Sequence, residues 1–443
     1  MDRDTAEPSV TSLPGDRAKR WVEYHHEVSA PSTYVYEFVL DASGPASGPF
    51  CTDIDGNVLM DFTCHVASAP LGYNNPKITE FLDDIGLEDP LRIAGQDFYV
   101  SGGWPPESPG GPGPTQLMHR LVETTEQYGL DRVFLSNTGA EAVENAIKIC
   151  YNDGGHRAVT FEKAFHGRTL GALSLNRSKR VHRKGYPEIP GVISVPYCSC
   201  SGDCTCGWET DGPGGNVLAD RLDPAQGNLD PEEVAYIILE PVQGEGGYRV
   251  PAASFVDDLK HILETYDIRL VADEIQSGLG RTGKMWAIEH TDLKPDVIAS
   301  AKGLRVGATI ASESLFPEET GRISSTWGAG DILGTMRGVA VLDAIEGYDL
   351  LANVTERGRQ FREQLEDADL PGVTNVRGLG LMLAIDFESK DRRDAVVDAA
   401  FDRGLLVLGC GYQTLRVLPP LDVTEREIDL AVDLLTESIN ASA

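Results

Sequence analysis

The chain has 443 residues, in which 69 aspartates and glutamates outweigh 38 lysines and arginines and give a formal net charge of −31. A chain of this length can bury a large core in one to three domains, and its negative charge argues against nucleic acid and anionic membranes as partners. No run of eighteen apolar residues predicts a membrane span.

The acidic excess is accompanied by a preference for arginine over lysine. Such a composition is typical of proteins from a salt-loaded cytoplasm, where high ionic strength screens the repulsion between like charges, and an ordinary acidic enzyme is the alternative. The N-terminal sequence is polar and has no apolar signal-peptide core, so we expect a soluble, cytoplasmic protein. Eight cysteines in so long a chain do not indicate a disulfide scaffold.

The N-terminal segment is predicted to combine a short helix with strands. We expect the helix over residues 17–27 and strands over residues 35–40 and 49–62. Asp55-Gly56 interrupts the second strand with a strong hairpin signal.

A Gly/Pro-rich stretch precedes the first predicted binding feature. Residues 101–114 must form a loop, either a lid over a site or a surface or interface insertion. A helix over residues 117–128 and a strand over 132–135 then lead into the turn SNTGAE, from Ser136 to Glu141, which opens another helix. A glycine turn at a helix N-terminus presents N–H groups and the positive end of the dipole to a phosphate, although a plain N-cap gives the same pattern.

Two further motifs follow apolar strands. After the strand over residues 158–161, Phe165 is suited to stack on a planar ligand and Arg168 to bind a carboxylate; a core phenylalanine and a surface arginine are the alternatives. The strand over residues 235–239 ends at Glu240.

An acid and an amine end the next two apolar strands. Asp273 follows the strand over residues 269–272, and Lys302 ends the apolar run 296–301. Ligands of α/β sheets bind at the carboxyl ends of the strands. A lysine at such a position is partly desolvated, which favours its neutral, nucleophilic form and suits imine chemistry. A helix N-cap and a solvated loop lysine are the alternatives for each residue alone.

The sequence YCSCSGDCTCGW contains four closely spaced thiols, here named the cysteine cluster. Its members are Cys198, Cys200, Cys204 and Cys206. Four thiols within nine residues could bind zinc or an iron–sulfur cluster, but the C-x-C-x3-C-x-C spacing is not the usual paired C-x2-C. A structural metal, a disulfide and free thiols in a surface insertion all stay open.

The stretch DEIQSGLGRTG, followed by PDVIASAKG, resembles the cofactor core of class III aminotransferases, enzymes that depend on pyridoxal 5'-phosphate (PLP). The resemblance extends from about Tyr34 to the C-terminus. It implies the α/β architecture of PLP-dependent transferase fold type I, in which a large domain holds a mostly parallel seven-stranded sheet and a small α/β domain is built from the N- and C-terminal segments. We place the N-terminal segment at residues 1–70, the large PLP-binding domain at 71–334 and the C-terminal small domain at 335–443.

The resemblance also implies a role for each matching residue. Lys302 condenses with the cofactor aldehyde, and Asp273 keeps the pyridine nitrogen protonated. Arg168 binds a substrate carboxylate, and Glu245 acts as a gate that forms an ion pair with Arg416. The other implied cofactor contacts are Thr138, Gly139, Ala140, Phe165, Glu240, Gln243, Ile275, Gln276 and, from the partner across a homodimer interface, Thr326.

Some segments differ between branches of the family. The short loop after Lys302 and the segment GRISSTWGAGD are reminiscent of lysine 6-aminotransferases, whereas GLGRTG is closer to the 4-aminobutyrate and ornithine enzymes. His166 stands where an aromatic residue is usual, and we expect only a supporting role for it.

These features lead us to expect ping-pong transfer of an amino group from an ω-amino compound to 2-oxoglutarate. The candidate donors are lysine, 4-aminobutyrate, ornithine and acetylornithine. An isomerase of the same fold, either an amino-acid racemase or an aminomutase, is the alternative. A binding protein without activity is a third possibility.

Overall fold

A computed structural model describes residues 1–85, 96, 113–324, 329 and 331–443. Two predictions lie outside these residues. They are nearly all of the loop over residues 101–114 and the role of Thr326 at a dimer interface.

The described chain forms two compact units. One consists of Met1–Thr79 with Tyr348–Ala443, and the other of Glu80–Gly347. The predicted domain breaks followed residues 70 and 334, whereas the contacts within the chain change after residues 79 and 347. Both ends of the chain therefore belong to the same unit.

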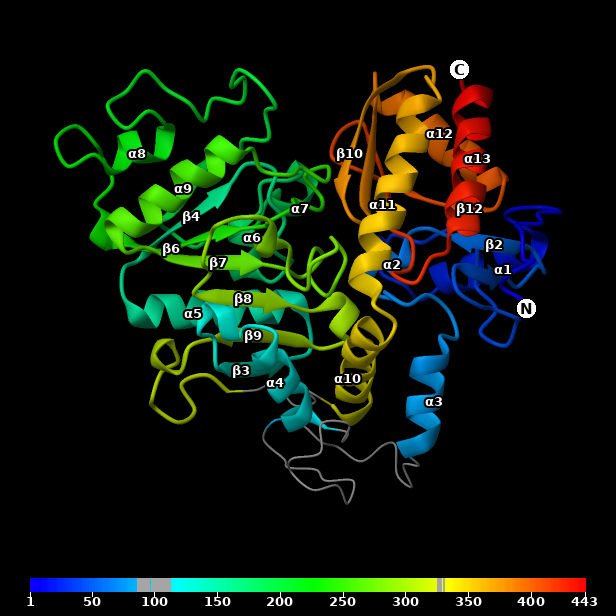
Figure 1. Cartoon of the computed structure of the whole chain (residues 1–443), viewed down its shortest axis with the longest axis horizontal. Helices are drawn as coiled ribbons and strands as arrows, with labels where there is room; N and C mark the ends of the chain where they lie inside the picture. Colours follow the sequence, from blue (N-terminus) through cyan, green and yellow to red (C-terminus); the bar gives the residue numbers. More distant parts are fainter. Residues whose placement is uncertain (86–95, 97–112, 325–328, 330) are drawn as a thin grey trace. The chain divides into compact units, whose positions relative to one another are not determined.

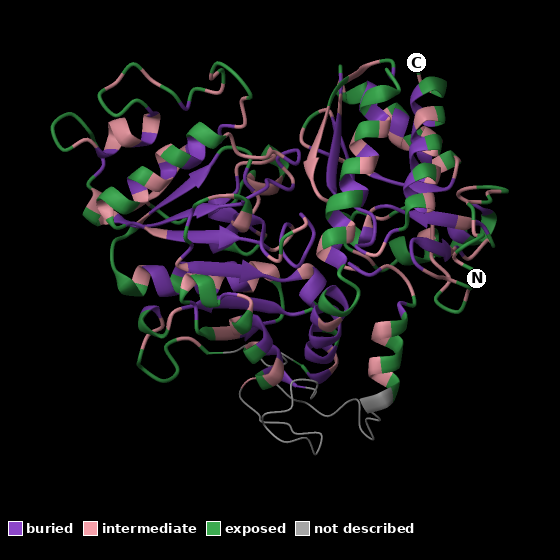
Figure 2. Ribbon diagram, viewed as in Figure 1, coloured by how far each residue is buried: buried purple, intermediate pink, exposed green. Residues whose placement is uncertain are grey.

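The larger unit is built on a seven-stranded sheet with the strand order β3-β9-β8-β7-β6-β4-β5 (Figure 1). β9 is antiparallel to both neighbours and the other neighbouring pairs are parallel, which confirms the predicted mostly parallel sheet. β6, β8 and β9 are buried throughout, as strands covered on both faces require (Figure 2). The strands are β3 Arg132–Ser136, β4 Arg157–Phe161, β5 Val192–Val195, β6 Val234–Leu239, β7 Arg269–Asp273, β8 Val297–Ser300 and β9 Gly307–Ala311.

Helices cover this sheet. α5 supplies much of the core through Val143, Ala146 and Cys150, which belong to one apolar cluster with Ile238 of β6 and Val271 of β7. Among the described helices, none combines the length and the apolar character needed to cross a membrane. The helices of the larger unit are α4 Pro114–Glu123, α5 Gly139–Asp153, α6 Leu170–Leu175, α7 Arg180–Arg183, α8 Val217–Leu222, α9 Ala253–Tyr266 and α10 Ile332–Gly347.

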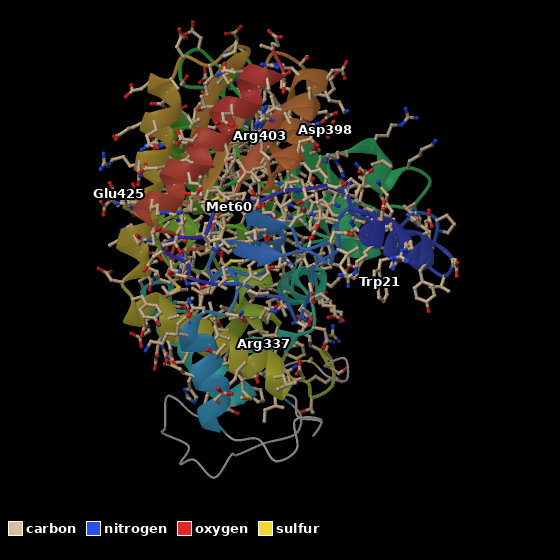
Figure 3. All side chains as sticks on the ribbon, turned by 90° about the vertical axis from the view of Figure 1, so that its right-hand side faces the viewer. Trp21, Met60, Arg337, Asp398, Arg403 and Glu425 are labelled. Atoms are coloured by element: carbon tan, nitrogen blue, oxygen red, sulfur yellow. The ribbon has the colours of Figure 1, made fainter. Side chains whose placement is uncertain are left out.

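The smaller unit joins the two ends of the chain in two sheets, ordered β1-β2-β12 and β10-β11-β14-β13. Met60 of β2 pairs in parallel with Leu405 of β12, so the N- and C-terminal segments share a sheet. Trp21 on α1 is half-exposed and points outward (Figure 3). The strands are β1 Phe50–Thr52, β2 Val58–Asp61, β10 Val373–Leu379, β11 Met382–Phe387, β12 Leu405–Leu406, β13 Leu408–Cys410 and β14 Thr414–Val417. The helices are α1 Asp16–His26, α2 Cys64–Ala67, α11 Leu350–Asp367, α12 Lys390–Asp402 and α13 Glu425–Ala441, while α3 Pro76–Ile85 runs from this unit into the larger one.

The predicted strand over residues 35–40 is wrong. Only Leu40 forms a β-bridge, to Asp53. The alternating aromatic residues that suggested a strand instead pack on each other and on α12, with ring centres 5.4 Å apart for Tyr36 and Phe38 and 5.9 Å apart for Phe38 and Phe401. Side-chain packing therefore holds the start of this segment, and backbone hydrogen bonds such as that from Ile54 to Val39 hold only its end.

Candidate active site

The predicted acid and amine lie at the same edge of the larger sheet. Asp273 is the last residue of β7 and pairs laterally with Ala299 of β8, and Lys302 lies just beyond the end of β8. Neighbouring strands are about 4.8 Å apart, and three residues of chain span at most about 10 Å. Glu240 follows β6, the neighbour of β7 on its other side. One ligand at this edge can therefore contact all three strand ends.

Asp273 is buried and bonded to a buried histidine. Its Oδ2 lies 2.7 Å from Nδ1 of His166, and its Oδ1 accepts the backbone N–H of Ile275 at 3.1 Å. The backbone N–H of His166 donates to Oδ1 of Asn176 at 2.6 Å. His166 Nε2 is buried and finds no hydrogen-bond partner among the described residues. Only a supporting role was predicted for this histidine, and its direct contact with Asp273 was not predicted.

Two more buried carboxyl groups flank this pair. Burial raises the pKa of Glu240 to about 7, opposed by His166 and reinforced by Asp273. Burial likewise raises the pKa of Glu274 to about 7, against the hydrogen bond from Ser277. Both carboxyl groups therefore titrate near neutral pH.

Lys302 has an unusual backbone conformation. Its φ is +45°, in the left-handed region, and it begins a single 3₁₀ turn over Lys302–Leu304. A lysine there is uncommon, and such backbone strain concentrates at functional sites. Its side chain is half-buried, as predicted for a partly desolvated amine.

The predicted phosphate turn forms the N-terminus of α5. Thr138 is the N-cap and forms a capping box with Glu141. The N–H groups of Gly139 and Ala140 belong to the first turn, where a helix cannot pair them internally. A Cβ on Gly139 would lie 2.8 Å from Cδ1 of Ile275, so glycine lets this turn approach the end of β7.

Two glutamines add unpaired acceptors to the same region. Oε1 of Gln276 and Oε1 of Gln243 are buried and have no hydrogen-bond partner in the described chain. Gln243 donates through Nε2 to the carbonyl of Glu162 at 2.8 Å. Turning the amide of Gln276 by 180° would present its N–H₂ group to an acceptor, because amide orientation is set by the hydrogen-bond network.

This set of residues fits PLP. A buried acid suits a protonated ring nitrogen, and a helix N-terminus suits a phosphate. A strand-end amine suits an aldehyde. The unpaired polar atoms of His166 and Gln276 leave hydrogen-bonding capacity that a polar heterocycle would use.

Phe165 contacts two of the predicted site residues, Glu240 and Arg168. Its backbone N–H donates to Oε1 of Glu240 at 2.9 Å, and the guanidinium carbon of the exposed Arg168 lies 5.7 Å from the centre of its ring. Glu245 Oε2 pairs with Lys179 Nζ at 3.0 Å, a contact that no pattern in the sequence predicts. The predicted partner of Glu245, Arg416, is a buried residue of β14 in the other unit, and their ion pair stays a prediction.

Comparison with known proteins identifies relatives along almost the whole chain. The sequence profile described as "Aminotransferase class-III" matches residues 39–439. The acetylornithine aminotransferase of Aquifex aeolicus is 34% identical over 401 residues, which cover 88% of this chain and 94% of the relative. The alanine/serine racemase of Pyrococcus horikoshii is 29% identical over 451 residues, which cover 97% of this chain and 92% of the relative.

A solved structure has the same fold. The lysine aminotransferase from M. tuberculosis superposes with a TM-score of 0.80 at 27% identity, covering 96% of this chain and 99% of that chain. The match extends over both units described above.

Proposed function

The chain belongs to the class III aminotransferases, which depend on PLP, and we propose that it transfers the terminal amino group of a small ω-amino compound to 2-oxoglutarate. The observation that carries this proposal is the position of Lys302 and Asp273 at neighbouring strand ends. The donor class is supported by similarity to an acetylornithine aminotransferase and a lysine aminotransferase, both named for donors with a terminal amine.

Some residues of the site are proposed to bind the cofactor, and others to hold or transfer protons. When bound, PLP supplies an aldehyde that takes the amino group from one substrate and gives it to the next, and a ring that withdraws electrons from the substrate carbon. Asp273, supported by His166, holds a proton at the ring nitrogen. Lys302 Nζ moves the proton at the substrate carbon. The first turn of α5 would bind the phosphate, and Phe165 would stack on the ring.

Glu245 is proposed as the gate that lets one site accept two kinds of substrate. A dicarboxylate needs a free arginine, whereas an ω-amine needs that cation shielded. Glu245 would shield Arg416 in the first half-reaction and release it in the second, and its contact with Lys179 offers the carboxylate an alternative position. Glu245→Ala should improve the use of α-amino donors, because Arg416 would then stay unshielded in both half-reactions. An unchanged donor profile in Glu245→Ala would count against the gate.

We also propose a homodimer, in which Thr326 reaches the partner's phosphate site, and a salt-loaded cytoplasm as the working environment. The net charge of −31 supports the second proposal, because salt screens the self-repulsion of so acidic a chain. Thermal unfolding across a KCl series is the test. Full stability and activity without salt would contradict it.

A donor panel tests the main proposal. Lysine, 4-aminobutyrate, ornithine and N-acetylornithine are each incubated with the PLP-loaded enzyme and 2-oxoglutarate in high KCl, and glutamate is measured. We expect at least one of these donors to form glutamate faster than alanine does. Glutamate formation from alanine alone would refute the donor class.

The similarity to an alanine/serine racemase supports one alternative, an isomerase built on the same site. An isomerase converts its substrate without an oxo acid. Chiral chromatography of L-alanine and L-serine incubated without 2-oxoglutarate separates the two functions. Inversion under these conditions, together with no glutamate formation in the panel, would establish the isomerase.

A further inference from the structure

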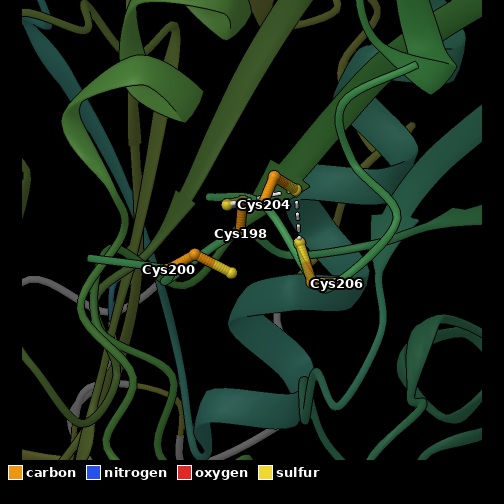
Figure 4. Close-up of side chains that lie close together, drawn as sticks. All are labelled: Cys198, Cys200, Cys204 and Cys206. Carbon is orange, nitrogen blue, oxygen red and sulfur yellow. Dashed lines mark hydrogen bonds between the residues drawn. The ribbon is translucent and has the colours of Figure 1, made fainter. Parts of the chain in front are cut away.

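The cysteine cluster lies in the long connection between β5 and β6, and none of its members is assigned to PLP. Its four sulfur atoms all lie within 4.8 Å of one another (Figure 4). The separation is 3.4 Å between Sγ of Cys204 and Sγ of Cys206, and 4.0 Å between Sγ of Cys198 and Sγ of Cys204. Cys198 is buried and the other three are half-buried.

These separations match the ligands of a single tetrahedral ion. A zinc–thiolate bond of about 2.3 Å places neighbouring sulfur atoms of a tetrahedron about 3.8 Å apart, between the two separations above. A disulfide needs about 2.05 Å between sulfur atoms. The four thiolates of an iron–sulfur cluster are shared among two or four iron atoms, and those bound to different irons must lie farther apart than the ligands of one ion.

The surroundings of the cluster already hold these residues in place. The backbone N–H of Glu209 donates to Sγ of Cys204 at 3.5 Å, the kind of outer contact that orients a metal-bound thiolate. Trp208, which follows the cluster, is fully buried, donates through Nε1 to Asp258 at 2.7 Å and packs on Phe255 with ring centres 4.6 Å apart. The cluster is therefore fixed on the α9 side of the larger unit.

The cluster is also connected to the loop that carries the proposed gate. The hydroxyl of Tyr197 donates to the carbonyl oxygens of Pro241 at 3.3 Å and Arg249 at 3.2 Å. Nη1 of Arg249 donates to Oγ of Ser199, between the first two cysteines. The backbone N–H of Ala252 donates to the carbonyl oxygen of Cys198. The segment over residues 240–252 thus rests against the start of the cluster.

We propose that the cysteine cluster binds one Zn²⁺ ion through four thiolates, and that this ion fastens residues 197–208 against the segment 240–252. Zinc suits the position because a structural site with four thiolates is closed and needs no further ligand. The ion takes no part in amino transfer and acts by holding backbone.

Metal analysis of the full chain is the first test. Protein loaded with PLP and purified without chelator should contain one zinc per chain by inductively coupled plasma mass spectrometry. The variants Cys204→Ser and Cys206→Ser should lose this zinc, and Cys150→Ala, which removes a buried thiol of α5 outside the cluster, should keep it. Zinc retained in both serine variants would overturn the proposal, as would iron bound in its place.

A second test does not depend on the folding of the variants. Wild-type protein stripped of metal and supplied with cobalt(II) chloride should show the visible absorption of tetrahedral cobalt with thiolate-to-metal charge transfer. Thiol titration of the purified protein distinguishes the alternatives, because disulfides would leave fewer reactive thiols after the metal is removed. Octahedral cobalt spectra or paired cysteines would refute the site.

Hydrogen exchange tests whether the zinc ion fastens residues 197–208 against residues 240–252. Loss of zinc should speed the exchange of backbone amides over residues 197–208 and also over 240–252, and should leave β8 unchanged. Faster exchange confined to residues 197–208 would overturn the proposed fastening of the second segment. Because the readout is exchange and metal content, this outcome is independent of which donor the enzyme uses.

Discussion

The two units differ in the partners of their acidic side chains. At the sheet edge of the larger unit, Glu240 accepts the N–H groups of Phe165 and Gly244, so neutral dipoles satisfy it. In the smaller unit, Arg3 spans two carboxylates, with 2.8 Å from its Nη1 to Oδ2 of Asp422 and 2.7 Å from its Nε to Oε1 of Glu427. Glu240 therefore has a pKa close to neutral pH, whereas Arg3 fixes Asp422 and Glu427 in ion pairs.

The difference follows from what each region has to do. Burial raises the pKa of Asp422, but the charge and hydrogen bond of Arg3 oppose that rise. Burial raises the pKa of Glu240 and of Glu274 to about 7. Groups that titrate near neutral pH are typical of sites that handle protons, whereas a paired network joins the two ends of the chain.

The largest expected effect is the loss of the amine at the functional edge. Lys302→Ala should lower the transamination rate by about 10⁴-fold, because the proton at the substrate carbon loses its carrier. Lys294→Ala, at an exposed lysine of the same segment, is the matched control and should retain full activity. Stopped-flow rates with saturating donor and the visible absorption of PLP are the measurements. Residual activity above about a tenth of wild type would remove Lys302 from its assigned role.

The second-largest expected effect is that of substituting the buried acid Asp273. Asp273→Asn keeps the shape but cannot hold a positive charge at the ring nitrogen, so kcat should fall by about 10³-fold with little change in stability. Asp296→Asn is the control at the opposite edge of the sheet, where Oδ2 of Asp296 accepts the N–H of Leu270. That variant should lose stability and keep its kcat. Equal losses of kcat in the two variants would show that the sheet, rather than the proton at the ring, is being perturbed.

The sequence predicted the parts of this edge that local pattern encodes. Asp273 and Lys302 were found because each ends an apolar run, and the N-cap at Thr138 because its turn opens an amphipathic helix. The bond between His166 and Asp273 was not found, since it joins residues 107 positions apart. It depends on β4 and β7 flanking β6, and strand order is not visible in one sequence.

The smaller unit was harder to predict for the same reason. Arg3 stands in the polar stretch before the first predicted helix, yet its partner Glu427 lies 424 residues away. The strand expected over residues 35–40 failed because alternation in a sequence does not say whether a neighbouring strand is available. Long-range contacts decided both cases.

A substitution of Arg3 measures how much its ion pairs contribute to stability. Arg3→Met should lower the free energy of unfolding by about 2–3 kcal/mol, because it leaves the buried Glu427 and the half-buried Asp422 without their cation. Arg359→Met is the control, since its pair with Glu363 is exposed and contributes at most about 0.5 kcal/mol. Urea unfolding measures both. At temperatures where Arg3→Met is folded its kcat should equal that of wild type, and a lowered kcat would mean that this network also shapes the active site.

The smallest expected effect is the dependence of stability on pH that the buried carboxyl group of Glu274 causes. The pKa of Glu274 rises from its usual value of 4.5 to about 7 in the folded chain. At a pH between these two values, Glu274 therefore keeps its proton in the folded chain and loses it in the unfolded chain. Its contribution to stability is therefore complete at low pH and is lost as pH rises through about 7, by at most about 3 kcal/mol.

Glu274→Gln removes this titration and can keep both contacts, accepting the N–H of Ile288 and donating to Oγ of Ser277. The melting temperature of the variant should fall less than that of wild type between pH 5 and pH 8, as measured by calorimetry at constant salt. Glu264→Gln, at an exposed position of α9, should follow the wild-type curve. Parallel curves for wild type and Glu274→Gln would mean that this carboxyl group is ionised throughout, and that the sheet edge stabilises its charge as fully as Arg3 does in the other unit.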